Sequence, residues 1–219
     1  MKLEEAEQRL RDALRRPLPG HDAFLELSGY KRPDLDAARR SDPPPRSSAV
    51  LALSYEKHAQ AHILLMLRPE YAGAHSGQVA FPGGRREEND ADLMATALRE
   101  YSEETGASAG SIDVLGELTP VYIPPSRSLV SPFVGIVAET GPFVPDEREV
   151  AELIEAPLEL VLRDDILKRR EQHIAIMGRS VEIPYFDVMG HVVWGATAMI
   201  LAEFLAVLRG GVAFAADPY

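Results

Sequence analysis

The chain has 219 residues, which suits one domain with extensions, and 46% of them are hydrophobic, which is enough to form a packed core. It contains no cysteine, which excludes disulfides, thiolate metal sites and cysteine nucleophiles. The net charge of −11 argues against a nucleic-acid partner, because an acidic surface repels phosphate groups.

The N-terminal segment, residues 1–47, is predicted to be an extension made of a helix and a Pro-rich strap. Leucine and alanine recur at helical spacing among charged residues over 2–16, which indicates a short amphipathic helix. Residues 40–46 include Pro43-Pro44-Pro45, which cannot form the interior of a helix. The first helix is rich in acidic residues, unlike a transit peptide, and no stretch of the chain reaches the ~20 apolar residues of a membrane span. We therefore expect no membrane partner and a cytoplasmic location.

The main domain is predicted over residues 48–208, where short apolar runs alternate with polar residues. Residues 49–53 and 62–67 are typical of the first two strands of a sheet, and 78–81 of a third. A helix is predicted over 92–105, begun by Asp92 and closed by Gly106. Further strands are predicted at 114–118, 129–138 and 183–188, further helices at 157–170 and 194–208, and a loose tail at 213–219 within the C-terminal segment 209–219. Because strands outnumber helices and are mixed with them, we expect an α/β (α+β) sandwich around a mixed sheet.

The predicted helix 92–105 presents carboxylates on one face. Glu100, Glu103 and Glu104 are spaced i, i+3 and i+4, whereas apolar residues occupy another face. Like charges at this spacing destabilise a helix by roughly 0.2–0.5 kcal/mol per pair, so such a group is usually neutralised by something positive. Hard divalent cations such as Mg²⁺ or Mn²⁺ prefer oxygen ligands. The alternative is an acidic helix face that contacts only solvent.

The residues around these glutamates favour the metal-binding interpretation. Gly84 and the segment Arg99-Glu100-Tyr101-Ser102-Glu103-Glu104-Thr105-Gly106 resemble the Nudix box, G-x5-E-x7-R-E-U-x-E-E-x-G-U, in which U is a bulky apolar residue. The R-E-x-x-E-E-x-G core is complete, although Tyr101 and Ala107 are imperfect matches to the apolar positions. Asp90 lies nine residues before Arg99, where the general pattern has an acid at eight. The resemblance implies a Nudix-type α/β/α sandwich around a mixed β-sheet.

Metal binding by Glu100, Glu103 and Glu104 is implied by the same resemblance, with Mg²⁺ or Mn²⁺ as the cofactor. Bound divalent metals lower the pKa of water and stabilise the charge that develops on a pyrophosphate. A general base completes the catalytic set, and the candidates are Glu103, within the box, and Glu149, in an acidic loop outside it. The alternative for Glu149 is a solvated charge.

Structural roles are implied for the remaining residues of the motif. Arg99 can pair with Glu103 or hold the loop that precedes the helix. Gly83 and Gly84 allow a tight turn before the helix, and Gly106 ends it.

The segment Leu64 to Gly84, LLMLRPEYAGAHSGQVAFPGG, is similar to the signature of coenzyme A pyrophosphatases, L-L-T-x-R-[SA]-x3-R-x3-G-x3-F-P-G-G. The positions that match are Leu64, Leu65, Arg68, Gly77, Phe81, Pro82, Gly83 and Gly84, and those that differ are Met66, Pro69 and Gly73. The difference at Gly73 matters most, because an arginine there could hold a phosphate or carboxylate bidentately. The similarity continues after the box, as at Trp194-Gly195-Ala196-Thr197, and covers roughly residues 48–208.

Three residues near the Gly83-Gly84 loop are candidates for substrate binding. Arg68 ends a predicted strand and matches the signature, so its guanidinium could contact a phosphate. His75 and Gln78 flank the same loop. The alternative for each is an ordinary polar residue of the surface.

The resemblance implies metal-dependent hydrolysis of a pyrophosphate bond in a nucleoside-diphosphate derivative. Coenzyme A is the leading substrate, with 3′-phosphoadenosine 5′-phosphate and 4′-phosphopantetheine as products. The alternatives are the same reaction on ADP-ribose, NADH, a dinucleotide or an acyl-coenzyme A, and a non-catalytic Nudix module that senses nucleotides. The expected partner is therefore a small nucleotide-type molecule, and the sequence is also compatible with a homodimer.

Overall fold

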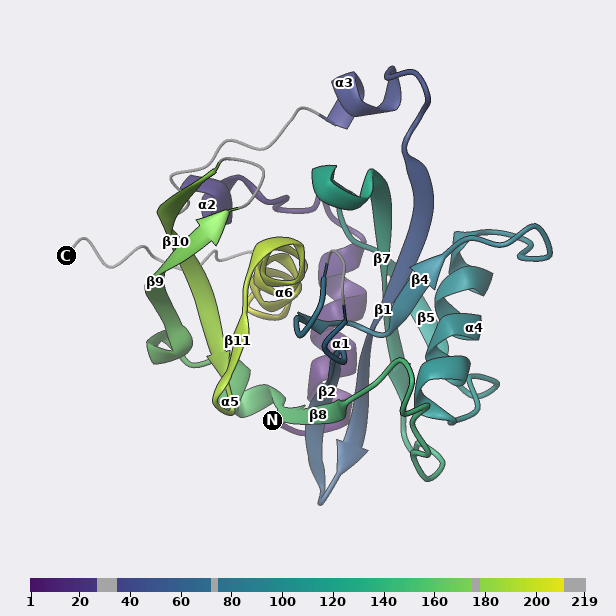
Figure 1. Ribbon diagram of the computed structural model, residues 1–219. Coiled ribbons are helices and arrows are strands. Elements are labelled where there is room, and N and C mark those ends of the chain that lie inside the picture. Colours follow the sequence, from purple (N-terminus) through teal and green to yellow (C-terminus); the bar gives the residue numbers. More distant parts are fainter. Residues whose placement is uncertain (27–34, 72–74, 175–177, 211–219) are drawn as a thin grey trace.

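Figure 1 shows a computed structural model in which helices cover both faces of a mixed β-sheet. The structure describes residues 1–26, 35–71, 75–174 and 178–210. Two clusters of buried apolar side chains, one on each face of the sheet, form the core. The predicted α+β sandwich is therefore confirmed.

The centre of the sheet is β1 (Arg46–Lys57), which pairs with β2 (Gln60–Leu67) on one side and with β7 (Ser128–Val137) on the other. The β1–β7 pairing is parallel, and the other pairings of this eight-stranded sheet are antiparallel. The shorter strands are β3 (Val79–Ala80) and β8 (Glu152–Pro157), which pair with β2; β4 (Gly83–Arg85), which pairs with β1; and β5 (Asp113–Glu117) and β6 (Val121–Ile123), which pair with β7. The pairing of β4 brings the double glycine against the first half of β1.

Helix α4 (Leu93–Thr105) packs on one face of this sheet. Leu53 of β1 and Tyr101 of α4 are both fully buried in the cluster between them. The Asp92 side chain begins the helix by accepting the Ala95 N–H at 2.8 Å, and Gly106, with φ of 71°, ends it in the left-handed region. Both helix ends are thus where the sequence predicts them, and the side chains of Glu100 and Glu104 face β4.

Helices α1 (Leu3–Leu14) and α6 (Gly195–Leu208) cover the opposite face. Residues 198–208 of α6 are all buried, as expected for a helix that is apolar on every side. Figure 1 shows α6 between α1 and a three-stranded sheet of β9 (Leu167–Ile174), β10 (Arg179–Val188) and β11 (His191–Val193). Among the described residues, no helix is both long and apolar enough to cross a membrane.

The predicted helix over 157–170 is wrong. Helix α5 (Leu158–Val161) ends after four residues, the 3-10 turn η2 (Asp164–Ile166) follows, and β9 begins at Leu167. Apolar residues at 158, 161 and 162 imitate helical spacing, but residues 168–173 are all polar and offer no apolar stripe to pack. Antiparallel pairing with β10 along the whole of β9 stabilises a strand instead.

The other predicted helices and strands are present with shifted ends, and β1 is longer than the predicted strand at 49–53. The sequence did not predict β4, β6, β8, β11, α2 (Asp22–Glu26), α3 (Leu35–Arg39) or the 3-10 turn η1 (Pro124–Ser126), each of which has six residues or fewer. Segments this short do not show a periodicity that identifies them. The predicted tail at 213–219 lies outside the described residues.

A buried carboxylate joins α6 to the loops on either side of it. Glu203 is 1% exposed, and its oxygens accept the Thr119 N–H at 2.9 Å, the Thr119 hydroxyl at 2.6 Å and the Gly20 N–H at 3.0 Å. We expect Glu203→Ala to lower the free energy of unfolding by about 2–5 kcal/mol, because it removes the buried acceptor of these three hydrogen bonds. Urea unfolding measures the change, and Glu4→Ala on the exposed side of α1 is the control. Equal stability of the two variants would contradict this account of Glu203.

Candidate active site

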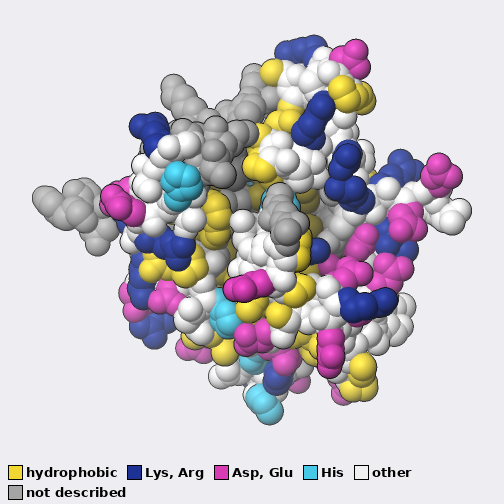
Figure 2. Space-filling model, in the orientation of Figure 1, with side chains coloured by type: hydrophobic (Ala, Val, Ile, Leu, Met, Phe, Trp, Pro, Cys, Tyr) yellow, Lys and Arg dark blue, Asp and Glu magenta, His cyan; other side chains and the backbone are white. Residues whose placement is uncertain are grey.

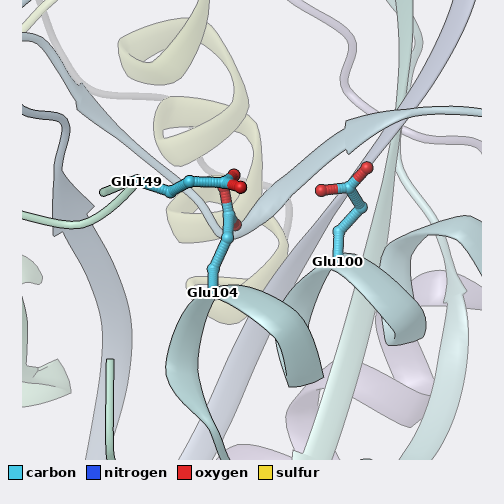
Figure 3. A group of neighbouring side chains, drawn as sticks. All are labelled: Glu100, Glu104 and Glu149. Atoms are coloured by element: carbon cyan, nitrogen blue, oxygen red, sulfur yellow. The ribbon is translucent and has the colours of Figure 1, made fainter. Parts of the chain in front are cut away.

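Three carboxylates from separate parts of the chain meet beside β4. Glu100 and Glu104 project from α4, and Glu149 comes from the loop before β8. Each offers one carboxylate oxygen, and these oxygens lie within 4.8 Å of one another (Figure 3). Carboxylates brought this close repel one another unless a cation or protons neutralise them.

Glu104 is the most enclosed member of this carboxylate cluster. It is 1% exposed, its Oε2 accepts the Gly83 N–H at 2.8 Å, and its Oε1 lies 3.5 Å from Arg68 Nη1. Burial raises the pKa of Glu104 to about 8, although the Gly83 N–H and the positive charge of Arg68 act in the opposite direction. A divalent cation at this position would favour the ionised form, so the site suits a bound metal.

Glu100 is enclosed by the double glycine of β4. Its side chain is 14% exposed, and burial is the largest cause that raises the pKa of its carboxyl, with smaller contributions from Glu103 and Glu149. Arg99 Nη1 lies 3.1 Å from Glu100 Oε1 and acts in the opposite direction. Gly84 faces this carboxylate so closely that a Cβ at position 84 would lie 2.5 Å from Glu100 Oε2.

Glu103 lies outside the carboxylate cluster. Its side chain is 57% exposed, and its Oε2 accepts a hydrogen bond from Arg99 Nη1 at 2.7 Å. The predicted pairing of Arg99 with Glu103 is therefore present. The predicted roles of Glu103 in metal binding and catalysis stay predictions.

Arg99 and Asp90 fasten the loop before α4 to the helix. Asp90 is 7% exposed and accepts from Arg99 Nε at 2.9 Å, Arg99 Nη2 at 3.0 Å, the Thr96 hydroxyl at 2.9 Å and the Glu87 N–H at 2.9 Å. The Arg99 guanidinium and these other donors hold the pKa of Asp90 well below its usual range. Arg99 Nη2 also donates to the Arg85 carbonyl at 3.0 Å, which connects the helix to β4. These contacts join the loop, α4 and β4 beside the carboxylate cluster.

Gly83 has a backbone that only glycine adopts easily. Its φ is 152°, and a Cβ at this position would lie 2.6 Å from the Cα of Val50. This close approach lets the Gly83 N–H point at Glu104. The predicted tight turn at Gly83-Gly84 is wrong, because both glycines lie in strand β4 and pair with β1; Gly83 instead positions a hydrogen-bond donor in the site.

A cleft of roughly 1390 Å³ opens in front of the carboxylate cluster, and Glu100, Glu104 and Glu149 line it. The three residues predicted to bind substrate, Arg68, His75 and Gln78, also line it. His75 Nδ1 and Gln78 Oε1 lie 3.2 Å apart, so these two side chains contact each other. Gly73, the position at which the sequence departs most from the coenzyme A signature, lies outside the described residues.

Several residues of the cleft were not predicted from the sequence. Trp194 is half-buried and lines the cleft, and His173 of β9 and Ile183 of β10 line it too. Arg46 and Arg127 line it as well. Apart from Trp194, these residues belong to none of the motifs in the sequence, and the packing of the small sheet and the β1–β7 pairing bring them to the cleft.

Carboxylate oxygens that converge at one end of an open cleft can bind hard divalent cations and present them to a ligand. Figure 2 shows Asp and Glu side chains gathered over β4 and α4, and Lys and Arg side chains between α3 and β4. The donor set of this carboxylate cluster therefore fits a hard divalent cation such as Mg²⁺ or Mn²⁺.

Comparison with known proteins adds independent information. The NUDIX domain matches residues 45–176, a segment that contains the whole carboxylate cluster. The Arabidopsis thaliana protein "Nudix hydrolase 15, mitochondrial" is 33% identical over 170 residues, which are 75% of this chain and 59% of that protein. "Uncharacterized Nudix hydrolase NudL" of Yersinia enterocolitica is 37% identical over 139 residues, which are 64% of this chain and 70% of that protein. A crystal structure of a Nudix hydrolase from M. smegmatis is 25% identical, covers 53% of this chain and 73% of its own, and superposes with a TM-score of 0.45. The chain thus spans less than two thirds of the plant relative.

Proposed function

Since the chain belongs to the Nudix hydrolase family, we propose that it hydrolyses the pyrophosphate bond of coenzyme A or a close derivative, with Mg²⁺ or Mn²⁺ as cofactor. Nudix hydrolases in general depend on divalent metals, and the carboxylate cluster is a suitable place for them. The products would be 3′-phosphoadenosine 5′-phosphate and 4′-phosphopantetheine.

The observation that carries this proposal is the position of the coenzyme A signature relative to the carboxylate cluster. Arg68, Phe81 and the Gly83-Gly84 pair, all from the signature, line the same cleft as Glu100 and Glu104. Residues that resemble a substrate signature therefore lie next to the residues that could bind the metal. This arrangement supports coenzyme A as substrate.

Four side chains of the cleft would have separate roles in this reaction. Glu100 and Glu104 would hold the metal, which when bound lowers the pKa of water and stabilises charge on the phosphate oxygens. Glu149, at the open side of the carboxylate cluster, would take the proton of the attacking water, since Glu103 faces outward and pairs with Arg99. Arg68 would bind a phosphate oxygen.

A substrate panel tests the proposal. Coenzyme A, dephospho-coenzyme A, ADP-ribose and NADH are compared by kcat/KM at equal metal concentration, and release of 3′-phosphoadenosine 5′-phosphate identifies the bond that is cleaved. Coenzyme A is expected to give the highest kcat/KM. If ADP-ribose or NADH exceeds it tenfold or more, the proposed substrate is wrong and the family assignment stands.

The role of Arg68 gives a separate prediction. Its side chain is 25% exposed and lines the cleft 3.5 Å from Glu104. Arg68→Ala should raise KM by about tenfold or more with a smaller fall in kcat, because one charge-assisted hydrogen bond to substrate is lost. Steady-state kinetics measures both constants, with Arg163→Ala, an exposed arginine that does not line the cleft, as the control. An unchanged KM for every accepted substrate would show that Arg68 does not bind phosphate.

Metal binding is expected to depend on pH. In the metal-free protein the pKa of Glu104 is raised to about 8, so below that pH a metal must displace a proton. The same shift contributes stability at low pH that is lost as the pH rises through about 8. The affinity for Mg²⁺ should therefore rise by up to about tenfold per pH unit between pH 6 and 8 and then level off.

Calorimetric titration with Mg²⁺ at pH 6, 7, 8 and 9 measures this dependence, and chelation with EDTA should lower Tm most at the higher pH values. Glu104→Gln is the control, because it removes the titrating group and should flatten the profile. An affinity that does not change with pH in the unaltered protein would rule out displacement of a proton from Glu104.

A further inference from the structure

Two arginines that line the cleft lie next to each other along the backbone pairing of β1 and β7. Arg46 is the first residue of β1, and Arg127 immediately precedes β7. The Arg46 N–H donates to the Arg127 carbonyl at 2.8 Å, and Arg46 is in register with Ser128. Both arginines are exposed and line the cleft that also contains Glu100. The parallel β1–β7 pairing thus fixes their positions relative to each other.

Neither arginine has a carboxylate partner within the part of the chain that the structure describes. Arg127 donates to the Pro43 carbonyl, and Arg46 and Arg127 take part in none of the ion pairs there. Ser126, in the turn before Arg127, is another residue of the cleft lining, and its buried hydroxyl has no hydrogen-bond partner among the described residues. In a chain with a net charge of −11, two adjacent arginines without carboxylate partners on a cleft wall suit a bound anion.

Strand β1 sets the distance between these arginines and the carboxylate cluster. Ala49 of β1 pairs with Gly84, which faces the Glu100 carboxylate. Arg46 lies three residues before Ala49, which corresponds to about 10 Å of strand at ~3.3 Å per residue. A ligand whose pyrophosphate lies at Glu100 can therefore contact Arg46 only through a second anionic group that is close to the pyrophosphate.

We propose that Arg46 and Arg127 form an anion subsite that binds a second phosphate of the substrate, the phosphate monoester on the ribose of an adenosine 3′,5′-bisphosphate unit. The inference rests on the proposed function, because coenzyme A carries this monoester one ribose away from its pyrophosphate. Guanidinium groups match phosphate oxygens bidentately, which makes arginine suited to this contact. ADP-ribose, NADH and dephospho-coenzyme A lack the monoester, so the subsite would select against them.

Binding of two nucleotides that differ only in the 3′-phosphate monoester measures the contribution of that monoester separately from catalysis. Adenosine 3′,5′-bisphosphate and AMP are titrated by calorimetry, with Mg²⁺ present, into the unaltered protein, Arg46→Ala, Arg127→Ala and the control Arg16→Ala. Arg16 is exposed and does not line the cleft, and its loss changes the net charge equally. The unaltered protein and Arg16→Ala should bind the bisphosphate about tenfold to hundredfold more tightly than AMP. This ratio should fall toward one in Arg46→Ala and Arg127→Ala.

The subsite is overturned if the unaltered protein binds both nucleotides equally, or if the ratio is the same in all four proteins. Failure of the proposed function would give a different result. The unaltered protein would then cleave ADP-ribose better than coenzyme A, while the preference for the bisphosphate over AMP would still be lost in Arg127→Ala. In that case the proposed substrate is wrong and the anion subsite stands.

Discussion

Glu104→Gln is expected to reduce kcat by about a thousandfold or more while the fold persists. Glu104 is the buried carboxylate of the cluster, and a charged metal ligand in such a site can contribute several kcal/mol of transition-state stabilisation. The amide oxygen of glutamine can still accept the Gly83 N–H that Glu104 accepts at 2.8 Å, so the local structure should be retained. The measurement is kcat at saturating Mg²⁺ with the best substrate of the panel.

Stability distinguishes loss of metal binding from loss of fold in this variant. Because burial raises the pKa of Glu104, the neutral amide should not destabilise the metal-free protein at pH 8, and Tm without metal should be equal or higher. The added stabilisation by Mg²⁺ should be much reduced. Glu139→Gln, an exposed residue after β7, is the matched control and should keep normal turnover. A folded Glu104→Gln protein with near-normal kcat would refute the assignment of Glu104 as a metal ligand.

The part of the site that could be predicted from the sequence is the part on one helix. Residues three and four positions apart on a helix share a face, so Glu100 and Glu104 could be placed together before the structure was known. The same reasoning included Glu103, but three residues from Glu100 correspond to 300° of rotation and four residues to 400°, so Glu103 and Glu104 diverge by 100°. Glu104 turns toward β4, whereas Glu103 turns toward solvent and Arg99.

Glu149 shows why the rest could not be predicted with the same certainty. It lies in a loop without regular structure, held by the Glu149 N–H that donates to the Asp146 carbonyl at 2.9 Å and by the Asp146 N–H that donates to the Glu104 carbonyl at 3.1 Å. These contacts bring the loop to the C-terminal end of α4. They are made by backbone groups, so no hydrophobic periodicity in the sequence predicts them. The same limit applies to Trp194 and to the wall formed by β9 and β10, since the strand β9 has a polar sequence without alternation.

Gly84→Ala is expected to reduce kcat by about a hundredfold with little loss of stability. A Cβ at position 84 would lie 2.5 Å from Glu100 Oε2, so the Glu100 carboxylate must move, and small displacements of catalytic groups can cost this much in rate. The obstructing atoms are at the end of a flexible side chain, and Gly84 does not have positive φ. The backbone can therefore accept alanine, and the free energy of unfolding should change by less than about 1 kcal/mol.

Gly83→Ala provides the contrast one residue earlier in the chain. There φ is 152° and a Cβ would lie 2.6 Å from the Cα of Val50, so the backbone itself must shift and stability should fall by about 1–3 kcal/mol or more. Kinetics and urea unfolding of both variants separate the two effects. Gly84→Ala should lower kcat without lowering stability, whereas Gly83→Ala should lower both. If Gly84→Ala kept normal kcat, or lost stability as Gly83→Ala does, the double glycine would serve only the pairing of β4 with β1, and its close approach to Glu100 would have no part in catalysis.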